Sequence, residues 1–263
     1  MAKRFGNYLL HECVAQGGIT EIWMATDEFE NVVAIRKLRN RGLSTSGSKL
    51  FKAGLKVHRK LSPHPNVIRF INHGKTDGTL FMVLQYIHGT DLKALLARKH
   101  DIVDNVADVL IQMADGLNHL HDRGWIHLDY KPENIMVGDR PNMRDHVKVV
   151  DFGIAKVADT GHELASIQSI GGLFCGTPEY MSPEQATGAD VDRRSDLYSL
   201  GVILYQLLVG EVPFQDPTAL GVITKHLSET PIAPQERQPE IQPELSALAM
   251  RRISGFCALA IFA

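Results

Sequence analysis

Apolar residues follow two different periods along the chain, and the change from one to the other falls near residue 88. Before that point, short runs rich in β-branched residues at 32–35 and 80–84 are typical of strands. After it, apolar residues recur three and four positions apart over 106–120 and again from about 196 to 208, as on buried helix faces. The pattern predicts a β-rich first part with one helix and a mainly helical remainder.

Composition narrows the class of protein. The 263 residues are 44% hydrophobic and 22% charged, as in globular proteins, and they suffice for one large domain or two lobes sharing a cleft. A formal net charge of −2 argues against binding of the whole chain to nucleic acid. Cys13, Cys175 and Cys257 contain no CxxC pair, which indicates reduced thiols and a cytoplasmic location. We expect no membrane span, because no apolar run approaches the ~20 residues required.

Three polar motifs, at 127–134, 151–153 and 178–184, follow one another in the second part. The first two supply, in order, a carboxylate that can position a hydroxyl, a lysine beside it, and an amide and a second carboxylate that can hold magnesium. Each motif alone would be weak. Their order and spacing together indicate phosphoryl transfer.

This set of motifs resembles the eukaryotic-type (Hanks-type) protein kinases, and most closely their bacterial serine/threonine members. The resemblance covers residues 8 to about 228 and implies an α+β, two-lobed kinase fold. The small lobe, residues 1–88, is expected to have five strands and one helix and to bind nucleotide. The larger, mainly helical lobe, residues 89–263, is expected to carry the catalytic loop, with the joint between the lobes at 85–89.

The resemblance also implies roles for single residues. Asp129 is expected to be the catalytic base, or the group that orients the acceptor hydroxyl, and Lys131 to reach the transferring phosphate. Asn134 and Asp151 would bind Mg²⁺. Thr177 would belong to the loop that presents a protein substrate and would favour serine or threonine acceptors. A lysine at position 131 is typical of the serine/threonine subclass.

Two further positions bear on the catalytic loop. Asp196 resembles the buried aspartate with which the family braces that loop. Leu128 stands where the family usually has an arginine that pairs with a phosphorylated residue. We therefore expect activity to depend little on phosphorylation within 154–175, for example of Ser166 or Ser169.

The nucleotide-binding half departs from the family. In the glycine-rich stretch at 15–22 only Gly17 and Gly18 are present, so an ordinary hairpin turn remains the alternative to a phosphate-binding loop. Arg36 occupies the position of the family's lysine. Strand alternation points Arg36 into the cleft and Lys37 to the opposite face, unless a bulge shifts the register.

The helix that should carry the lysine's glutamate partner begins around residue 48, and Gly54 falls at the glutamate position. No acidic residue occurs between Asn31 and Thr76, so this helix cannot form the ion pair in any alignment. Its basic face is either solvated or a docking site for an acidic partner, and it comprises Lys49, Lys52, Lys56 and Lys60.

Other features of an ATP site remain. The resemblance assigns Ile22 and Ala34 to one face of the adenine and Met136 to the other. The adenine edge would meet backbone groups of Gln85 and Ile87, and the ribose would meet Asp91.

The end of the chain also differs from the family. No match is found for the arginine that should pair with Glu184, unless Arg251 or Arg252 substitutes. We therefore expect the final helices to be incomplete, either altered or truncated.

Two functions from different classes are favoured over a third, a small-molecule phosphotransferase of related fold, because residues 176–184 resemble a loop that presents protein acceptors. The first is an ATP- and Mg²⁺-dependent serine/threonine kinase that acts on protein substrates. The alternative is a pseudokinase that serves as a nucleotide-binding or scaffold module. The four intact positions of the catalytic half favour the enzyme, since a scaffold has little physical need for all of them.

Overall fold

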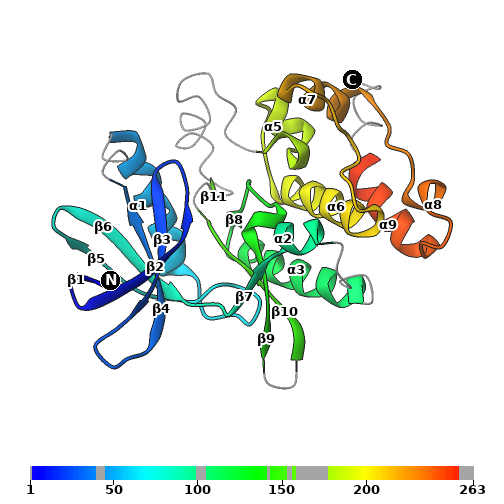
Figure 1. Cartoon of the computed structure of the whole chain (residues 1–263). Coiled ribbons are helices and arrows are strands. Elements are labelled where there is room, and N and C mark those ends of the chain that lie inside the picture. The colour runs from blue at the N-terminus through cyan, green and yellow to red at the C-terminus, as the bar shows by residue number, and fades with distance from the viewer. Residues whose placement is uncertain are drawn as a thin grey trace.

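The computed structural model describes residues 2–39, 45–98, 105–140, 143–152, 156–157 and 177–254. A sheet with one helix forms the first part, and helices dominate the second (Figure 1). This is the two-lobed α+β arrangement that the sequence predicts.

The first part is an antiparallel sheet in the order β1-β2-β3-β4-β6-β5, accompanied by α1 (Thr45–Lys60). The strands are β1 (Lys3–Phe5), β2 (Tyr8–Gln16), β3 (Thr20–Thr26), β4 (Val32–Leu38), β5 (Phe70–Thr76) and β6 (Thr79–Gln85). The sheet has six strands and not the expected five, because β1 precedes the start of the family resemblance and pairs with β2. The ring of Phe5 lies 5.2 Å from that of Phe81, and this buried contact anchors the short strand.

The two faces of the sheet bury different clusters. Val33 and Ile35 of β4 belong to the cluster around Phe81, while Ala34 and Leu38 pack with Phe51 of α1. Because side chains of a strand alternate, Arg36 lies on the same face as Ala34. The registers of β4 with β3 and with β6 run without a bulge, so this assignment holds along the strand.

The second part is built around α3 (Val106–His121) and α6 (Arg193–Val209), which share one apolar core. Around them lie α2 (Leu92–Ala97), α5 (Pro183–Thr187), α7 (Ala219–Ser228), α8 (Pro234–Arg237) and α9 (Pro243–Ser254). Its short strands are β7 (Gly89–Asp91), β8 (Trp125–Ile126), β9 (Ile135–Arg140), β10 (Met143–Val149) and β11 (Lys156–Val157). Two 3-10 turns, η3 (Pro132–Asn134) and η4 (Pro178–Tyr180), complete it.

Helix α6 begins three residues before the expected start at Asp196. The side chain of Asp192 accepts a hydrogen bond from the amide of Arg194 (2.7 Å) and so caps the helix at Arg193. The helix ends at Gly210, whose φ of 87° suits glycine. The cap therefore adds almost one turn ahead of the apolar stripe.

The segment that follows α1 ties the sheet to the second part. Val149 of β10 donates its amide to the carbonyl of Asn66 (2.9 Å), and the amide of Ile68 donates to the carbonyl of Val149 (3.0 Å). The buried Lys148 ammonium donates to the carbonyl of Pro65 (2.7 Å). These bonds join the segment between α1 and β5 to β10. The boundary at residue 88 stays a prediction.

At the other end of the chain, α9 packs on α6. A Cβ on Gly201 would lie 2.5 Å from the Cβ of Arg252, so only glycine allows this approach. Ala249 and Ile253 of α9 are buried in the main core. Helices α8 and α9 form and pack as far as residue 254, and the expected incompleteness of the final helices stays a prediction. In the ranges described above, no helix is both long and apolar enough to cross a membrane.

Candidate active site

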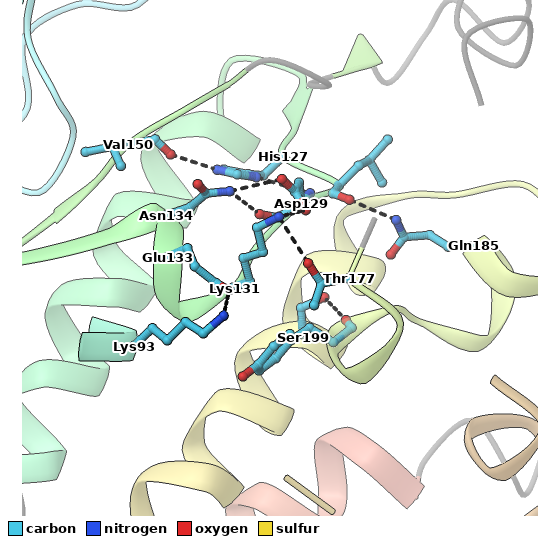
Figure 2. Close-up of polar contacts among 12 residues, drawn as sticks. Lys93, His127, Asp129, Lys131, Glu133, Asn134, Val150, Thr177, Gln185 and Ser199 are labelled. Atoms are coloured by element: carbon cyan, nitrogen blue, oxygen red, sulfur yellow. Dashed lines mark hydrogen bonds and ion pairs between the residues drawn. The ribbon is translucent and has the colours of Figure 1, made fainter. Parts of the chain in front are cut away.

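The loop between β8 and η3 holds the Asp129 carboxylate by both oxygens (Figure 2). Lys131 Nζ lies 2.9 Å from Asp129 Oδ1. The Asn134 side-chain amide donates to Asp129 Oδ2 (3.1 Å) and to the Asp129 carbonyl (2.7 Å). Burial raises the pKa of Asp129 above its ordinary value, and the charge of Lys131 opposes that shift. The carboxylate is therefore fixed in direction before any substrate arrives.

Lys131 also reaches the segment that begins η4. Its ammonium donates to Thr177 Oγ1 at 3.1 Å (Figure 2). The hydrogen bond thus joins the catalytic loop to a residue 46 positions further along the sequence. The structure brings Asp129, Lys131, Asn134 and Thr177 together, as the sequence analysis expects.

Asp196 of α6 holds the backbone of this loop by hydrogen bonds. Its side chain is 1% exposed and accepts the amides of His127 (2.8 Å) and Leu128 (2.8 Å). His121 Nε2 lies 2.7 Å from the same carboxylate. The sequence analysis assigns the brace to Asp196 and misses His121. One signal was available, since His121 stands four positions after the buried Leu117 on α3 and so shares its face.

Leu128 occupies a strained backbone conformation, with φ at 63°. A non-glycine residue in this region costs about 1–3 kcal/mol unless its surroundings hold it. Asp196 binds its amide, and the side chain of Gln185 donates to its carbonyl at 2.9 Å (Figure 2). The leucine side chain is buried and offers no charge where the family has arginine. Ser166 and Ser169 lie outside the described residues, so their dispensability stays a prediction.

Asp151, at the end of β10, meets the sheet across the cleft. Arg36 Nη1 lies 2.5 Å from Asp151 Oδ1, and Arg36 Nε donates to Thr20 Oγ1 (3.4 Å). Lys37 points the other way, where it pairs with Glu21 and lies 5.4 Å from the Phe5 ring centroid. Strand alternation is confirmed here, and Lys37 cannot replace Arg36 at the cleft.

Helix α1 approaches Asp151 without an acidic group. Gly54, at the expected glutamate position, is buried. One turn later His58 is buried with its ring 4.7 Å from Phe152 and 6.3 Å from Phe70. Burial lowers the pKa of His58 to about 3, so the ring is neutral. An aromatic contact thus joins α1 to the residue after Asp151, while Asp151 itself takes the arginine.

Asn134 and Asp151 form the donor set expected for Mg²⁺. The Asn134 amide nitrogen is turned toward Asp129, which leaves the amide oxygen as the group offered to a cation. An amide oxygen and a carboxylate are ligands that Mg²⁺ prefers. The residues fit the ion, although Arg36 shares the Asp151 carboxylate.

The glycine-rich stretch forms a turn between β2 and β3. Gly17 donates its amide to the carbonyl of Thr20 (2.8 Å), and Arg39 donates to the Gly17 carbonyl (3.0 Å). A Cβ on Gly18 would meet nothing within 4 Å. Because the Gly17 amide is used inside the turn, this conformation favours the ordinary hairpin over a phosphate-binding loop.

The expected adenine and ribose residues surround the joint between the two parts. Ala34 is buried, Ile22 packs in the same cluster, and Met136 pairs with Asp91 between β9 and β7. Two of the groups expected to bind ATP already make hydrogen bonds within the protein. The Gln85 amide donates to the Arg69 carbonyl (2.9 Å), and the Asp91 side chain caps α2 by accepting the Ala94 amide (2.8 Å). Half-buried Ile87 lies between β6 and β7, and the adenine contacts stay a prediction.

The basic face of α1 is open to solvent. On it, Lys52 and Lys56 are exposed, and Lys60 lies 5.9 Å from the Trp125 ring.

The carboxylate of Glu184 has a partner on α6. Glu184 accepts a hydrogen bond from Ser195. Arg251 and Arg252 are exposed, and neither pairs with Glu184 within the described residues, so a serine and not an arginine meets that carboxylate.

A sheet-based lobe and a helical lobe, with Asp129, Lys131 and Asn134 held together in the loop and turn that follow β8, define the architecture of a protein kinase. Residues 8–257 match the protein kinase domain family, and the chain belongs to that family.

Named relatives are bacterial serine/threonine kinases. The chain is 40% identical over 253 residues to serine/threonine-protein kinase pkn3 of Myxococcus xanthus, covering 94% of this chain and 46% of that protein. It is 33% identical over 255 residues to serine/threonine-protein kinase PknB of Mycolicibacterium smegmatis, covering 94% and 39%. It therefore spans less than half the length of these relatives.

Proposed function

We propose that this domain transfers the γ-phosphate of ATP to serine or threonine hydroxyls of protein substrates. The observation that carries the proposal is the position of the Lys131 ammonium, 2.9 Å from Asp129 Oδ1 and 3.1 Å from Thr177 Oγ1. One cation thus joins the group that would receive the acceptor's proton to the loop that would present the acceptor.

The chemistry follows from these positions. Asp129 accepts a hydrogen bond from the acceptor hydroxyl and takes its proton as the oxygen–phosphorus bond forms and the bond from the γ-phosphorus to its bridging oxygen breaks. Lys131 presents positive charge to the transferring phosphate. Asn134 and Asp151 would hold Mg²⁺, which neutralises charge on the phosphates when bound.

The altered small lobe sets the expected rate. Arg36 is the cation that faces the cleft, and no acidic residue of α1 holds it in place. Loss of one preorganised charge contact typically lowers a rate by about 10²–10³. Against the usual kinase turnover of about 1–100 s⁻¹, we infer a slow but measurable enzyme.

Transfer from labelled ATP with Mg²⁺, to the protein itself and to a basic acceptor protein, tests the proposal. Asp129→Asn and Lys131→Met are expected to remove transfer. Lys93→Met is the matched control, because Lys93 is an exposed lysine paired with Glu133 at 2.6 Å, away from Asp129. Folded wild-type protein that transfers no more than Asp129→Asn would instead support a pseudokinase that acts as a binding module.

Two expectations about surroundings rest on the same proposal. Because the reaction consumes ATP, we place the domain in the cytoplasm.

We also infer that an acidic partner segment docks on the basic face of α1, where Lys52 and Lys56 are exposed. Replacing both lysines by glutamate should weaken binding of an acidic peptide and leave a neutral peptide unaffected. Equal effects on both peptides would exclude this docking.

A further inference from the structure

The loop that begins with Thr177 rests on α6 through its last residue. Ser199 donates to the Tyr180 carbonyl (2.7 Å), and the Tyr180 hydroxyl donates to the Gln206 side chain (2.7 Å). At its first residue, Thr177 accepts from Lys131. The two ends of the loop, Thr177 and Tyr180, are therefore fixed, and its middle residues, Pro178 and Glu179, face a different element.

That element is α7, which contributes His226. The side chain is 5% exposed and packs between the rings of Phe214 (4.9 Å) and Tyr198 (5.6 Å). Burial lowers the pKa of His226 to about 4, and the backbone carbonyls of Glu179 and Pro178 oppose that fall. The imidazole is therefore neutral near pH 7, and only one of its nitrogens carries hydrogen.

The hydrogen bond between His226 and Tyr198 indicates which imidazole nitrogen of His226 carries the hydrogen. The Tyr198 hydroxyl lies 2.6 Å from His226 Nδ1. With the hydroxyl as donor, Nδ1 is the acceptor and the imidazole hydrogen lies on Nε2. Nε2 is buried and, within the described residues, makes no hydrogen bond of good geometry, but the carbonyls of Glu179 and Pro178 act on the ring and raise its pKa. A buried donor needs an acceptor, so a closer contact between the ring and these carbonyls of η4 is favourable.

We propose that His226 is a positioning residue for the acceptor-binding loop. Its Nε2–H binds a carbonyl of Pro178 or Glu179, and this holds Thr177 in place for Lys131. His226 touches no reacting atom and acts only through the loop. The proposal rests on the proposed function, because it assumes that the loop binds the acceptor.

Two isosteric substitutions separate the two nitrogens. In His226→Gln the side-chain amide can reach the place of Nε2 and donate to the loop. In His226→Asn the shorter amide can reach only the place of Nδ1, near Tyr198. We expect about a tenfold rise in the KM for a protein acceptor in the Asn variant, with kcat and the KM for ATP unchanged, and near-wild-type values in the Gln variant. Equal changes in both variants, or a change in the KM for ATP, would overturn the proposal.

Amide hydrogen exchange supplies a readout that does not depend on activity. The amides of Tyr180 and Met181 donate to the carbonyls of Thr177 (3.1 Å) and Pro178 (3.3 Å) within η4. We expect faster exchange at these two amides in His226→Asn than in His226→Gln, with the core amides of α6 unchanged in both. Identical exchange in the two variants would refute the positioning role. Different exchange in a protein that transfers no phosphate would refute the proposed function and leave the positioning role standing.

Discussion

Replacing Asp196 by asparagine removes a charge and one acceptor beneath the catalytic loop while keeping the side chain's shape. The carboxylate serves the amides of His127 and Leu128 and the ring of His121, all at 2.7–2.8 Å. An asparagine offers one oxygen. If that oxygen takes the place of Oδ2, its NH₂ group faces the Leu128 amide, donor against donor.

The structure allows the cost to be worked out. One buried amide left unpaired costs about 1–3 kcal/mol, and each remaining bond loses about 1 kcal/mol when its acceptor is no longer charged. With two remaining bonds the sum is about 3–5 kcal/mol, a large share of the ~5–15 kcal/mol that stabilises a typical domain. With a urea dependence of about 3 kcal/mol per molar, the unfolding midpoint should fall by about 1–1.5 M.

Urea unfolding followed by tryptophan fluorescence measures this directly. The chain has two tryptophans, and Trp125 is buried immediately before Ile126 and the loop. A Trp23→Phe background leaves Trp125 as the reporter. Asp190→Asn, an exposed site with the same change of charge, is the matched control. If Asp196→Asn and Asp190→Asn unfold at the same urea concentration, the reasoning about the brace is refuted.

Three further predictions concern other parts of the molecule. Arg36→Met should lower phosphate transfer at saturating ATP by about 10²-fold, whereas Lys37→Met, on the opposite face, should change it by about threefold or less; the reverse order would contradict the assigned faces. Gly201→Ala should destabilise the protein by about 1–3 kcal/mol, because its Cβ would meet that of Arg252 at 2.5 Å, and an unchanged melting temperature would argue against this tight packing. Since the pKa of His226 falls from 6.5 to about 4 on folding, the unfolded state binds more protons between these values and stability drops as the pH falls from 6.5 toward 4. The loss between pH 7 and pH 5 should therefore be about 2 kcal/mol greater in wild type than in His226→Gln, and equal losses would disprove the assignment.

Much of the catalytic half could be predicted because its groups lie close together in the chain. Asp129, Lys131 and Asn134 span six positions, and the turn at η3, where the Asn134 amide donates to the Lys131 carbonyl (2.9 Å), folds them onto one another. Local periodicity likewise predicted α3, and strand alternation assigned opposite faces to Arg36 and Lys37. These features depend on the chain's own short-range geometry.

Other features could not be predicted because they depend on partners far away in the sequence. The contact of Phe5 with Phe81 and the contact of His226 with Tyr198 both follow from packing. Arg36 could be expected to face the cleft, yet its partner could not be named, since Asp151 lies 115 positions away.

The amino-acid sequence by itself determined the class of protein and the absence of an acidic residue on α1, and it predicted the catalytic groups. Only the tertiary structure decided what replaces the missing ion pair. Bonds join β10 to residues 65–68, and in the same fold Arg36 reaches Asp151 while His58 packs on Phe152. A side chain's charge is a property of the sequence, but its partner is chosen by which groups the fold brings within a few ångströms, because charge and hydrogen-bond interactions of this strength act only at such distances.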